Sequence, residues 1–144
     1  MIIERGLSLT QPWATLMASG AKRIETRSWR TNYRGWIAIH AAKGFPSNCK
    51  TLCLTEPFAS ALLSAGVEDL NDLPLGRVIA VTCITDCRPT ESFRNISERA
   101  FGDYTSGRYG FVCGYPLKLR EPIPMKGALG IWRLVRPIRR EDLA

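Results

Sequence analysis

The segment that most limits how this chain can fold is the run 77–84, in which only Arg77 and Thr82 are polar. A nearly continuous apolar run of this length is typical of a strand that is covered on both faces. We therefore predict a central strand at 77–84. A central strand needs neighbours on both sides, and short alternating or apolar runs supply candidates at 5–10, 22–29, 36–42, 108–113, 117–123 and 131–135.

Two helical stretches interrupt these strands. Pro12 suits a first helical turn, Trp13, Leu16 and Met17 share one face, and Gly20 is placed to end that helix. Residues 47–63 predict one or two further helices, with Pro57 at a break or a first turn. Prolines 116, 122 and 124 fit strand edges and bulges. The pattern predicts an α+β fold, a small mixed β-barrel with flanking helices.

Length and composition set the broad class. The chain has 144 residues, of which 45% are hydrophobic, so we expect one globular domain over 1–144, with a charged, frayed tail at 136–144. The net charge of +7 favours a polyanionic partner, most often nucleic acid, although a merely basic surface explains the charge equally well. No segment resembles a membrane span, and Glu4 and Arg5 interrupt any signal peptide, so a cytoplasmic or nuclear location is expected.

Five cysteines raise the question of a metal. Cys49 and Cys53, and again Cys83 and Cys87, are four residues apart, and Cys113 stands alone. Structural zinc sites usually have tighter ligand pairs, so we expect small buried side chains instead. The odd count also argues against a disulfide framework. No metal and no cofactor are predicted.

Residues 20–29 carry the clearest functional signal. If 22–29 is one strand, Arg23, Glu25 and Arg27 share a face that must meet water or a ligand. Lys22 then falls on the opposite face, unless it lies at the helix–strand junction before regular pleating begins. A lysine can meet a phosphate, an arginine can form bidentate contacts, and a glutamate can accept from a base amino group. The alternative is a solvated strand face with internal ion pairs.

Aromatic and amide side chains near this run are further candidates. Trp29 follows a polar strand and is the preferred residue for stacking on a base. Trp13 shares a face with Leu16 and Met17, so a core position is favoured for it. Gln11 can bind a base edge or the backbone at the helix start, and the sequence does not separate these roles.

More distant residues complete the candidate set. His40, the only histidine, lies in an apolar strand and is expected to be a hydrogen-bonded structural residue rather than a general base. Lys43, Tyr109 and Lys126 are expected around the mouth of the cleft. Arginines 133, 136, 139 and 140 either widen a nucleic-acid footprint or keep the tail soluble.

Several of these segments together resemble a known family. The segments are 7–14 (LSLTQPWA), 20–29 (GAKRIETRSW), 34–41 (RGWIAIHA), 76–81 (GRVIAV), 109–112 (YGFV) and 122–127 (PIPMKG). In this order they resemble the ASCH domain (activating signal cointegrator homology), and most of all the domain of the transcription coactivator type, over roughly residues 4–135. The resemblance implies a PUA-like β-barrel whose cleft holds RNA or single-stranded nucleic acid.

The resemblance also implies a rival function. Small bacterial ASCH proteins that act as acetylcytidine amidohydrolases are similar at Gly20, Lys22 and Arg27, and use a threonine three residues after the lysine. Here that position is Glu25, and Thr26 would point to the other face of the strand. Another family member is described as a ribonuclease. In either case Lys22 and Glu25 are the candidate catalytic residues of a metal-independent hydrolase.

The sequence therefore predicts a protein of RNA metabolism or transcription regulation that holds RNA or single-stranded DNA in a basic cleft. A small hydrolase acting on RNA or on acetylated cytidine is the alternative, and a protein-interaction module is a third hypothesis. We expect a monomer with no membrane partner and with protein partners left open. The predicted binding residues are Gln11, Trp13, Lys22, Glu25, Arg27, Trp29, Lys43, Tyr109 and Lys126.

Overall fold

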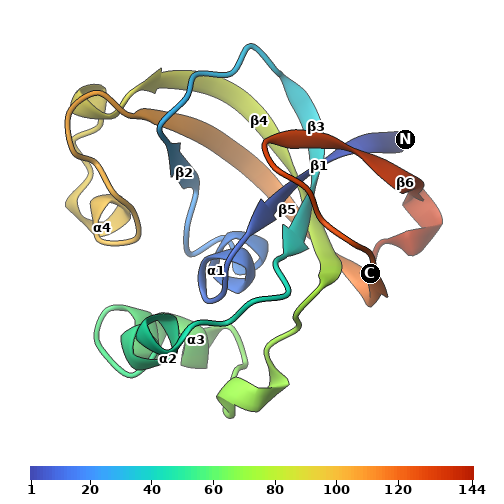
Figure 1. Cartoon of the computed structure of the whole chain (residues 1–144), viewed down its shortest axis with the longest axis horizontal. Helices are drawn as coiled ribbons and strands as arrows, with labels where there is room; N and C mark the ends of the chain where they lie inside the picture. Colours follow the sequence, from blue (N-terminus) through green and yellow to red (C-terminus); the bar gives the residue numbers. More distant parts are fainter.

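A computed structural model describes the whole chain, residues 1–144, and is built around one six-stranded sheet (Figure 1). The strands are β1 (Ile2–Leu9), β2 (Ile24–Arg27), β3 (Gly35–Ala41), β4 (Arg77–Pro89), β5 (Tyr109–Pro124) and β6 (Ile131–Arg139). They are ordered β2-β5-β4-β3-β1-β6. The predicted central strand is confirmed, because β4 lies between β5 and β3 and the side chains of Val78, Ala80 and Val81 are fully buried.

The sheet is curled like a barrel but is not closed by backbone pairing. β1 runs parallel to β3 and antiparallel to β6, and all other pairs are antiparallel. β2 and β6 are the two edge strands. The curl brings β2 to face β1, and the guanidinium Nη2 of Arg27 donates a hydrogen bond of 2.7 Å to the Ser8 carbonyl across the gap. The predicted α+β, PUA-like barrel is therefore confirmed in its open form.

Two predicted strands, 108–113 and 117–123, are parts of the single strand β5. The β4–β5 register shifts between Val81 and Cys83, where Tyr115 and Pro116 form the extra length on β5. Tyr115 has a positive φ of 55°. A bulge leaves a residue unpaired, so Pro116 is accommodated without losing a ladder hydrogen bond.

The helices are α1 (Trp13–Ser19), α2 (Ser47–Leu52), α3 (Phe58–Ser64) and α4 (Ile96–Arg99), with 3₁₀ turns at Leu70–Asp72, Thr90–Ser92 and Arg140–Asp142. α1 packs against the curled sheet with α2 and α3 on the same side, whereas the short α4 lies apart at the left of Figure 1. α1 ends as predicted at Gly20, whose φ of 85° is accessible to glycine at low cost. The predicted break in 47–63 is also present, and Pro57 is the residue before α3.

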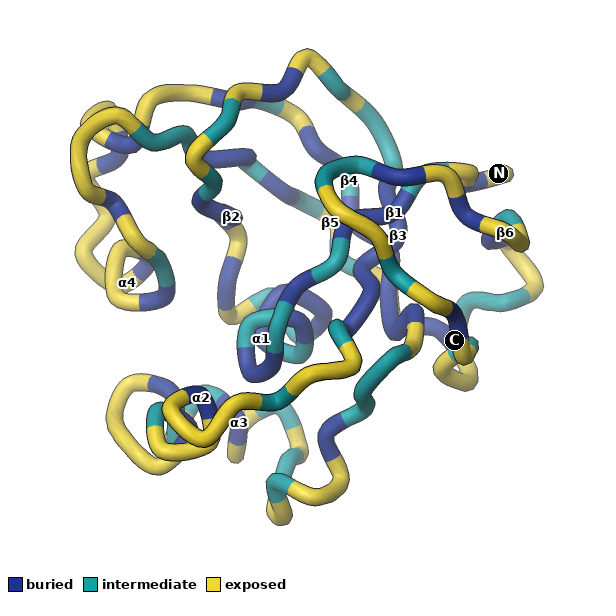
Figure 2. Tube along the Cα trace, in the orientation of Figure 1, coloured by how far each residue is buried: buried dark blue, intermediate teal, exposed yellow.

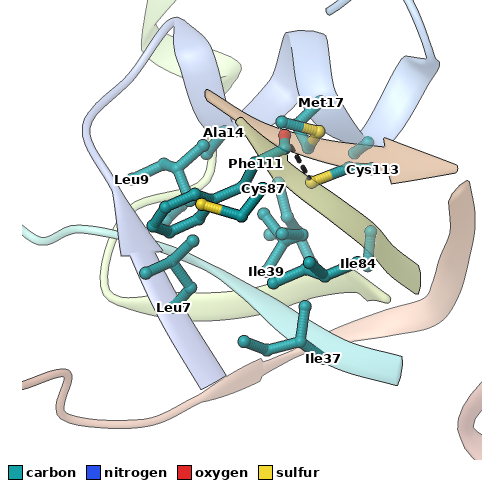
Figure 3. Close-up of a cluster of buried hydrophobic side chains, with 14 residues drawn as sticks. Leu7, Leu9, Ala14, Met17, Ile37, Ile39, Ile84, Cys87, Phe111 and Cys113 are labelled. Atoms are coloured by element: carbon teal, nitrogen blue, oxygen red, sulfur yellow. Dashed lines mark hydrogen bonds between the residues drawn. The ribbon is translucent and has the colours of Figure 1, made fainter. Parts of the chain in front are cut away.

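The largest core cluster fills the inside of the curled sheet. Leu7, Ile37, Ile39 and Phe111 point toward one another there, with Met17 of α1 above them (Figure 3). A second cluster under α1 and α3 contains Phe58 and Phe101 among others. Four of the five cysteines are buried and none is in a disulfide. Buried positions follow the sheet interior and α1, whereas the outer sides of α2 and α4 are exposed (Figure 2).

The C-terminal segment differs from the frayed tail expected at 136–144. β6 continues to Arg139, and Ile138 is fully buried. Arg136 forms an ion pair of 2.7 Å with Asp142, and Leu143 forms a bridge to Leu119 of β5. Charged composition suggested solvation, but the two apolar side chains anchor the segment to the sheet. None of the helices is long and apolar enough to span a membrane.

Candidate functional site

A cleft of ≈ 570 Å³ opens where β2 faces β1. We call it the β2 cleft. Its walls come from the end of β1, the start of α1, β2 with the residues before it, and the loop that follows α4. The lining residues used below are Ser8, Trp13, Lys22, Glu25, Thr26, Arg27, Phe58, Phe101 and Asp103.

Three charged residues form a continuous network along this cleft. The Lys22 ammonium lies 3.3 Å from Glu25 Oε1, and the Nε of Arg27 donates a 2.7 Å hydrogen bond to Glu25 Oε2. β2 is shorter than the predicted strand 22–29, because regular pairing begins only at Ile24. Lys22 therefore lies at the helix–strand junction, and strict alternation does not turn it away from Arg27.

Lys22 is the most enclosed member of the network, with 2% of the residue exposed. Besides Glu25, its ammonium donates to the carbonyl oxygens of Ile24 and Phe101. Two of its N–H groups thus donate to backbone carbonyls, and Glu25 supplies the counter-charge. Buried charges are stable only when paired and hydrogen-bonded, and Lys22 meets that condition. In this arrangement it joins β2 to the loop after α4.

Arg27 is the cation that retains free donors. Its Nε binds Glu25 and its Nη2 binds the Ser8 carbonyl, whereas Nη1 has no partner in the protein. Its side chain is about one-fifth exposed, at 21%. Tyr109 is paired with Arg27 across the β2–β5 ladder but does not line the cleft. The β2 cleft thus presents one guanidinium fork beside one carboxylate.

The opposite wall of the β2 cleft is aromatic. Trp13 packs edge-on against Phe58, with ring centroids 6.1 Å apart, and Phe58 packs edge-on against Phe101 at 5.3 Å. Among the tryptophans, only Trp132 donates a hydrogen bond from its indole N–H within the protein. Trp13 packs against two core clusters, as expected, but it also lines the cleft. Trp29 does not line the cleft and instead packs on Phe111 at 5.1 Å.

Gln11 is fully buried behind this wall. Its amide nitrogen donates to the Pro74 carbonyl and its amide oxygen accepts from the Thr15 N–H, each at 3.0 Å. Of its two expected roles, the structure shows the contact with backbone at the helix start. Both ends of the amide are bonded within the protein, so Gln11 fixes the entry to α1 and does not reach the cleft.

A second cleft of ≈ 880 Å³ holds the other two predicted lysines. We call it the lysine cleft, because Lys43 and Lys126 line it and both are exposed. Ser8 lines both clefts, so they are adjacent. The structure therefore separates the predicted cationic site into a β2 part with Lys22 and Arg27 and a second part with Lys43 and Lys126.

His40 forms the floor of the lysine cleft as a hydrogen-bonded structural residue. Its Nε2 lies 2.6 Å from the Met125 carbonyl, which can only accept, so Nε2 donates and Nδ1 accepts from Ser8 Oγ at 3.0 Å. Trp132 Nε1 donates to the same Ser8 oxygen at 3.2 Å. Burial lowers the pKa of His40, opposed by the hydrogen bond to Met125. Both ring nitrogens are thus occupied.

Three residues that hold the site together, Glu98, Asp103 and Ser8, were not identified as site residues from the sequence. Glu98 accepts hydrogen bonds from the backbone N–H groups of Arg23 and Ile24, at 2.8 and 2.9 Å, and so holds the start of β2. Thr26 Oγ1 accepts from the Asp103 N–H at 3.1 Å. Ser8 connects Arg27 to His40. Glu98 and Asp103 lie more than seventy residues from their partners, so no local pattern indicates either residue. For Ser8, the only signal in the sequence is the family motif at 7–14 that contains it.

Comparisons with known proteins agree with this architecture. The family model described as the ASCH domain matches residues 7–123. Over 134 residues the chain is 36% identical to human, and 34% to mouse, activating signal cointegrator 1; the matches cover 89% of this chain but only 22% of either relative. The crystal structure of an ASCH protein from Zymomonas mobilis superposes with a TM-score of 0.51 and 14% identity, covering 96% of this chain and 90% of that one.

Proposed function

This chain belongs to the ASCH domain family, and from that premise we propose that it binds RNA or single-stranded DNA by holding an unpaired base in the β2 cleft. The net charge of +7 supports a polyanionic partner. The relatives named as signal cointegrators support a role close to transcription or RNA metabolism. Because the chain spans about a fifth of those relatives, that wider role is part of the proposal.

The observation that carries the proposal is the pairing of polar and aromatic walls in one cleft. Arg27 Nη1 is free to donate, and the neighbouring Glu25 carboxylate accepts. Every nucleobase presents a donor next to an acceptor on its edge, which matches this pair. Trp13 lines the same cleft with its aromatic side chain. Stacking on an aromatic side chain adds affinity for any base.

The ion-pair network gives this wall a fixed geometry before a ligand arrives. Glu25 is held from both sides by Lys22 and Arg27, and Arg27 is held by Ser8 as well. Side chains that are already ordered lose less conformational entropy on binding. A base inside a duplex cannot enter such a cleft, so we propose single-stranded segments, loops or ends as the ligand.

Binding is preferred over hydrolysis because of Lys22. The hydrolase hypothesis needs a reactive lysine, but this ammonium is buried, is paired with Glu25 and donates to two backbone carbonyls. The Thr26 hydroxyl is close by but accepts from the Asp103 backbone. Lys22 therefore has a positioning role in our proposal, and Arg27, Glu25 and Trp13 contact the base.

The test compares Arg27→Lys and Trp13→Phe with wild type. Arg27→Lys keeps the charge but removes the fork, and Trp13→Phe keeps an aromatic ring but removes the indole N–H. Arg120→Lys, on an exposed position of β5, is the matched control. Affinity for fluorescent single-stranded RNA, single-stranded DNA and duplex is measured by anisotropy in about 50 mM salt. Gels of the same samples detect any cleavage.

We expect Arg27→Lys to weaken single-strand binding by roughly ten- to a hundredfold, the value of one good bidentate contact, because the base would lose both the Nη1 donor and the guanidinium that orients Glu25. Trp13→Phe should weaken it less, and the control should bind as wild type does. If wild type binds no single-stranded oligonucleotide at low salt, the proposal is wrong. Cleaved product that disappears in Lys22→Gln would instead support the hydrolase.

A further inference from the structure

We propose that the lysine cleft is a phosphate subsite for the same nucleic-acid strand whose base enters the β2 cleft. This inference rests on the proposed function and extends it. It assigns the β2 cleft to base recognition and the lysine cleft to the sugar–phosphate backbone of a neighbouring nucleotide. The strand would then pass over Ser8 and Gly127, between the two clefts.

The first support is unpaired charge. Lys43 and Lys126 are exposed, and neither forms an ion pair within the protein. No acidic residue lines the lysine cleft. The β2 cleft, by contrast, contains two carboxylates, Glu25 and Asp103. A cleft with one sign of charge concentrates ligands of the opposite sign.

The second support comes from the backbone. The N–H groups of residues 43–45 and 126–130 donate to no acceptor in the protein. Four residues of the second segment and one of the first line the lysine cleft. Backbone N–H groups must find a partner in water or in a ligand when the protein provides none. Unpaired N–H groups beside two lysines are the chemistry that binds phosphate oxygens.

The third support is the close contact between the clefts. A Cβ placed on Gly127 would lie 2.5 Å from Ser8 Oγ and 2.7 Å from the His40 ring, so the backbone at 127 lies directly against this pair. The backbone carbonyl of Ser8 binds Arg27 on the side of the β2 cleft, and its hydroxyl binds His40 on the side of the lysine cleft. Ser8 thus lies between Arg27 of the β2 cleft and the two unpaired lysines of the lysine cleft.

The experiment compares Lys43→Gln/Lys126→Gln with the charge-matched control Lys118→Gln/Arg120→Gln, both exposed positions on β5. Affinities are measured by anisotropy for a single-stranded octanucleotide, and by calorimetry for a nucleoside that has no phosphate. The octanucleotide titrations are repeated from about 50 to 200 mM salt, a range over which phosphate contacts are resolved.

For the octanucleotide, we expect the double variant to bind about tenfold more weakly at low salt, with a salt slope smaller by about 1.4, the value for two phosphate contacts on a single strand. Nucleoside affinity should be unchanged, and the control should keep the wild-type slope.

An unchanged slope in the double variant, while Arg27→Lys still weakens binding, overturns this inference and leaves the proposed function standing. Equal loss of nucleoside and octanucleotide affinity also overturns it, because the lysines would then act through the β2 cleft. Failure of wild type to bind any oligonucleotide would instead contradict the proposed function itself.

Discussion

The β2 cleft and the lysine cleft share Ser8 but use their charges in opposite ways. In the β2 cleft, Lys22 and Glu25 are buried, and each is paired. In the lysine cleft, Lys43 and Lys126 are exposed and unpaired. Burial makes an unpaired charge costly, whereas solvent screens an exposed one. Fixed geometry and available charge therefore come from different regions of one small protein.

The largest expected effect is a loss of folding stability on substitution of a paired residue in the β2 cleft. Glu25→Gln removes the counter-charge of a buried ammonium, so we expect the free energy of unfolding to fall by about 3–5 kcal/mol. Urea denaturation measures the change. Glu121→Gln, at an exposed and unpaired position, is the matched control and should stay within about 0.5 kcal/mol of wild type. A loss below about 1 kcal/mol in Glu25→Gln would mean that Lys22 does not depend on this pair.

A smaller effect is expected at the contact between the clefts. Gly127→Ala places a methyl group against Ser8 Oγ and the His40 ring, so we expect destabilisation of about 1–3 kcal/mol. Gly44→Ala is the matched control, because a Cβ there has no atom within 4 Å. The same denaturation experiment tests both. Equal stability of the two variants would show that the backbone at 127 can move away from Ser8 freely.

The smallest effect concerns the pH dependence of stability. Burial lowers the pKa of His40 in the folded protein below its ordinary value of 6.5. Below that value the unfolded chain binds a proton that the folded one resists, so stability should fall as the pH drops from about 6.5 toward the folded pKa. His40→Gln should flatten this part of the profile, as measured by thermal melts from pH 7.5 to 5. If the stability of His40→Gln changes with pH as that of wild type does, His40 has the same pKa in the folded and unfolded states.

Features determined by neighbouring residues could be predicted from the sequence. The apolar run of β4, the proline at the start of α1 and Gly20 at its end are local, and all were confirmed. Lys22, Glu25 and Arg27 were grouped correctly because they lie within six residues of one another. The alternation of residue types did not show that regular strand pairing begins only at Ile24. That boundary decides on which side of β2 the Lys22 side chain lies.

Features determined by distant contacts could not be predicted. The presence of Trp13 and the absence of Trp29 in the β2 cleft depend on Phe58 and Phe111, which the chain brings in from other elements. The division of the lysines into two clefts depends on how far the sheet curls. The order of the C-terminal segment depends on the packing of Ile138, a side chain that its charged surroundings concealed.

The open sheet also affects the tendency of this protein to self-associate. β6 pairs only with β1, so one side of a nine-residue strand is left without a partner. An unpaired strand edge is a template for adding another chain and hence for aggregation. Arginines 133, 136 and 139 lie along this edge, and Pro137 removes one of its N–H donors. The C-terminal arginines, first considered for nucleic-acid contact, thus have a second consequence: they make the exposed edge a poor surface for self-association.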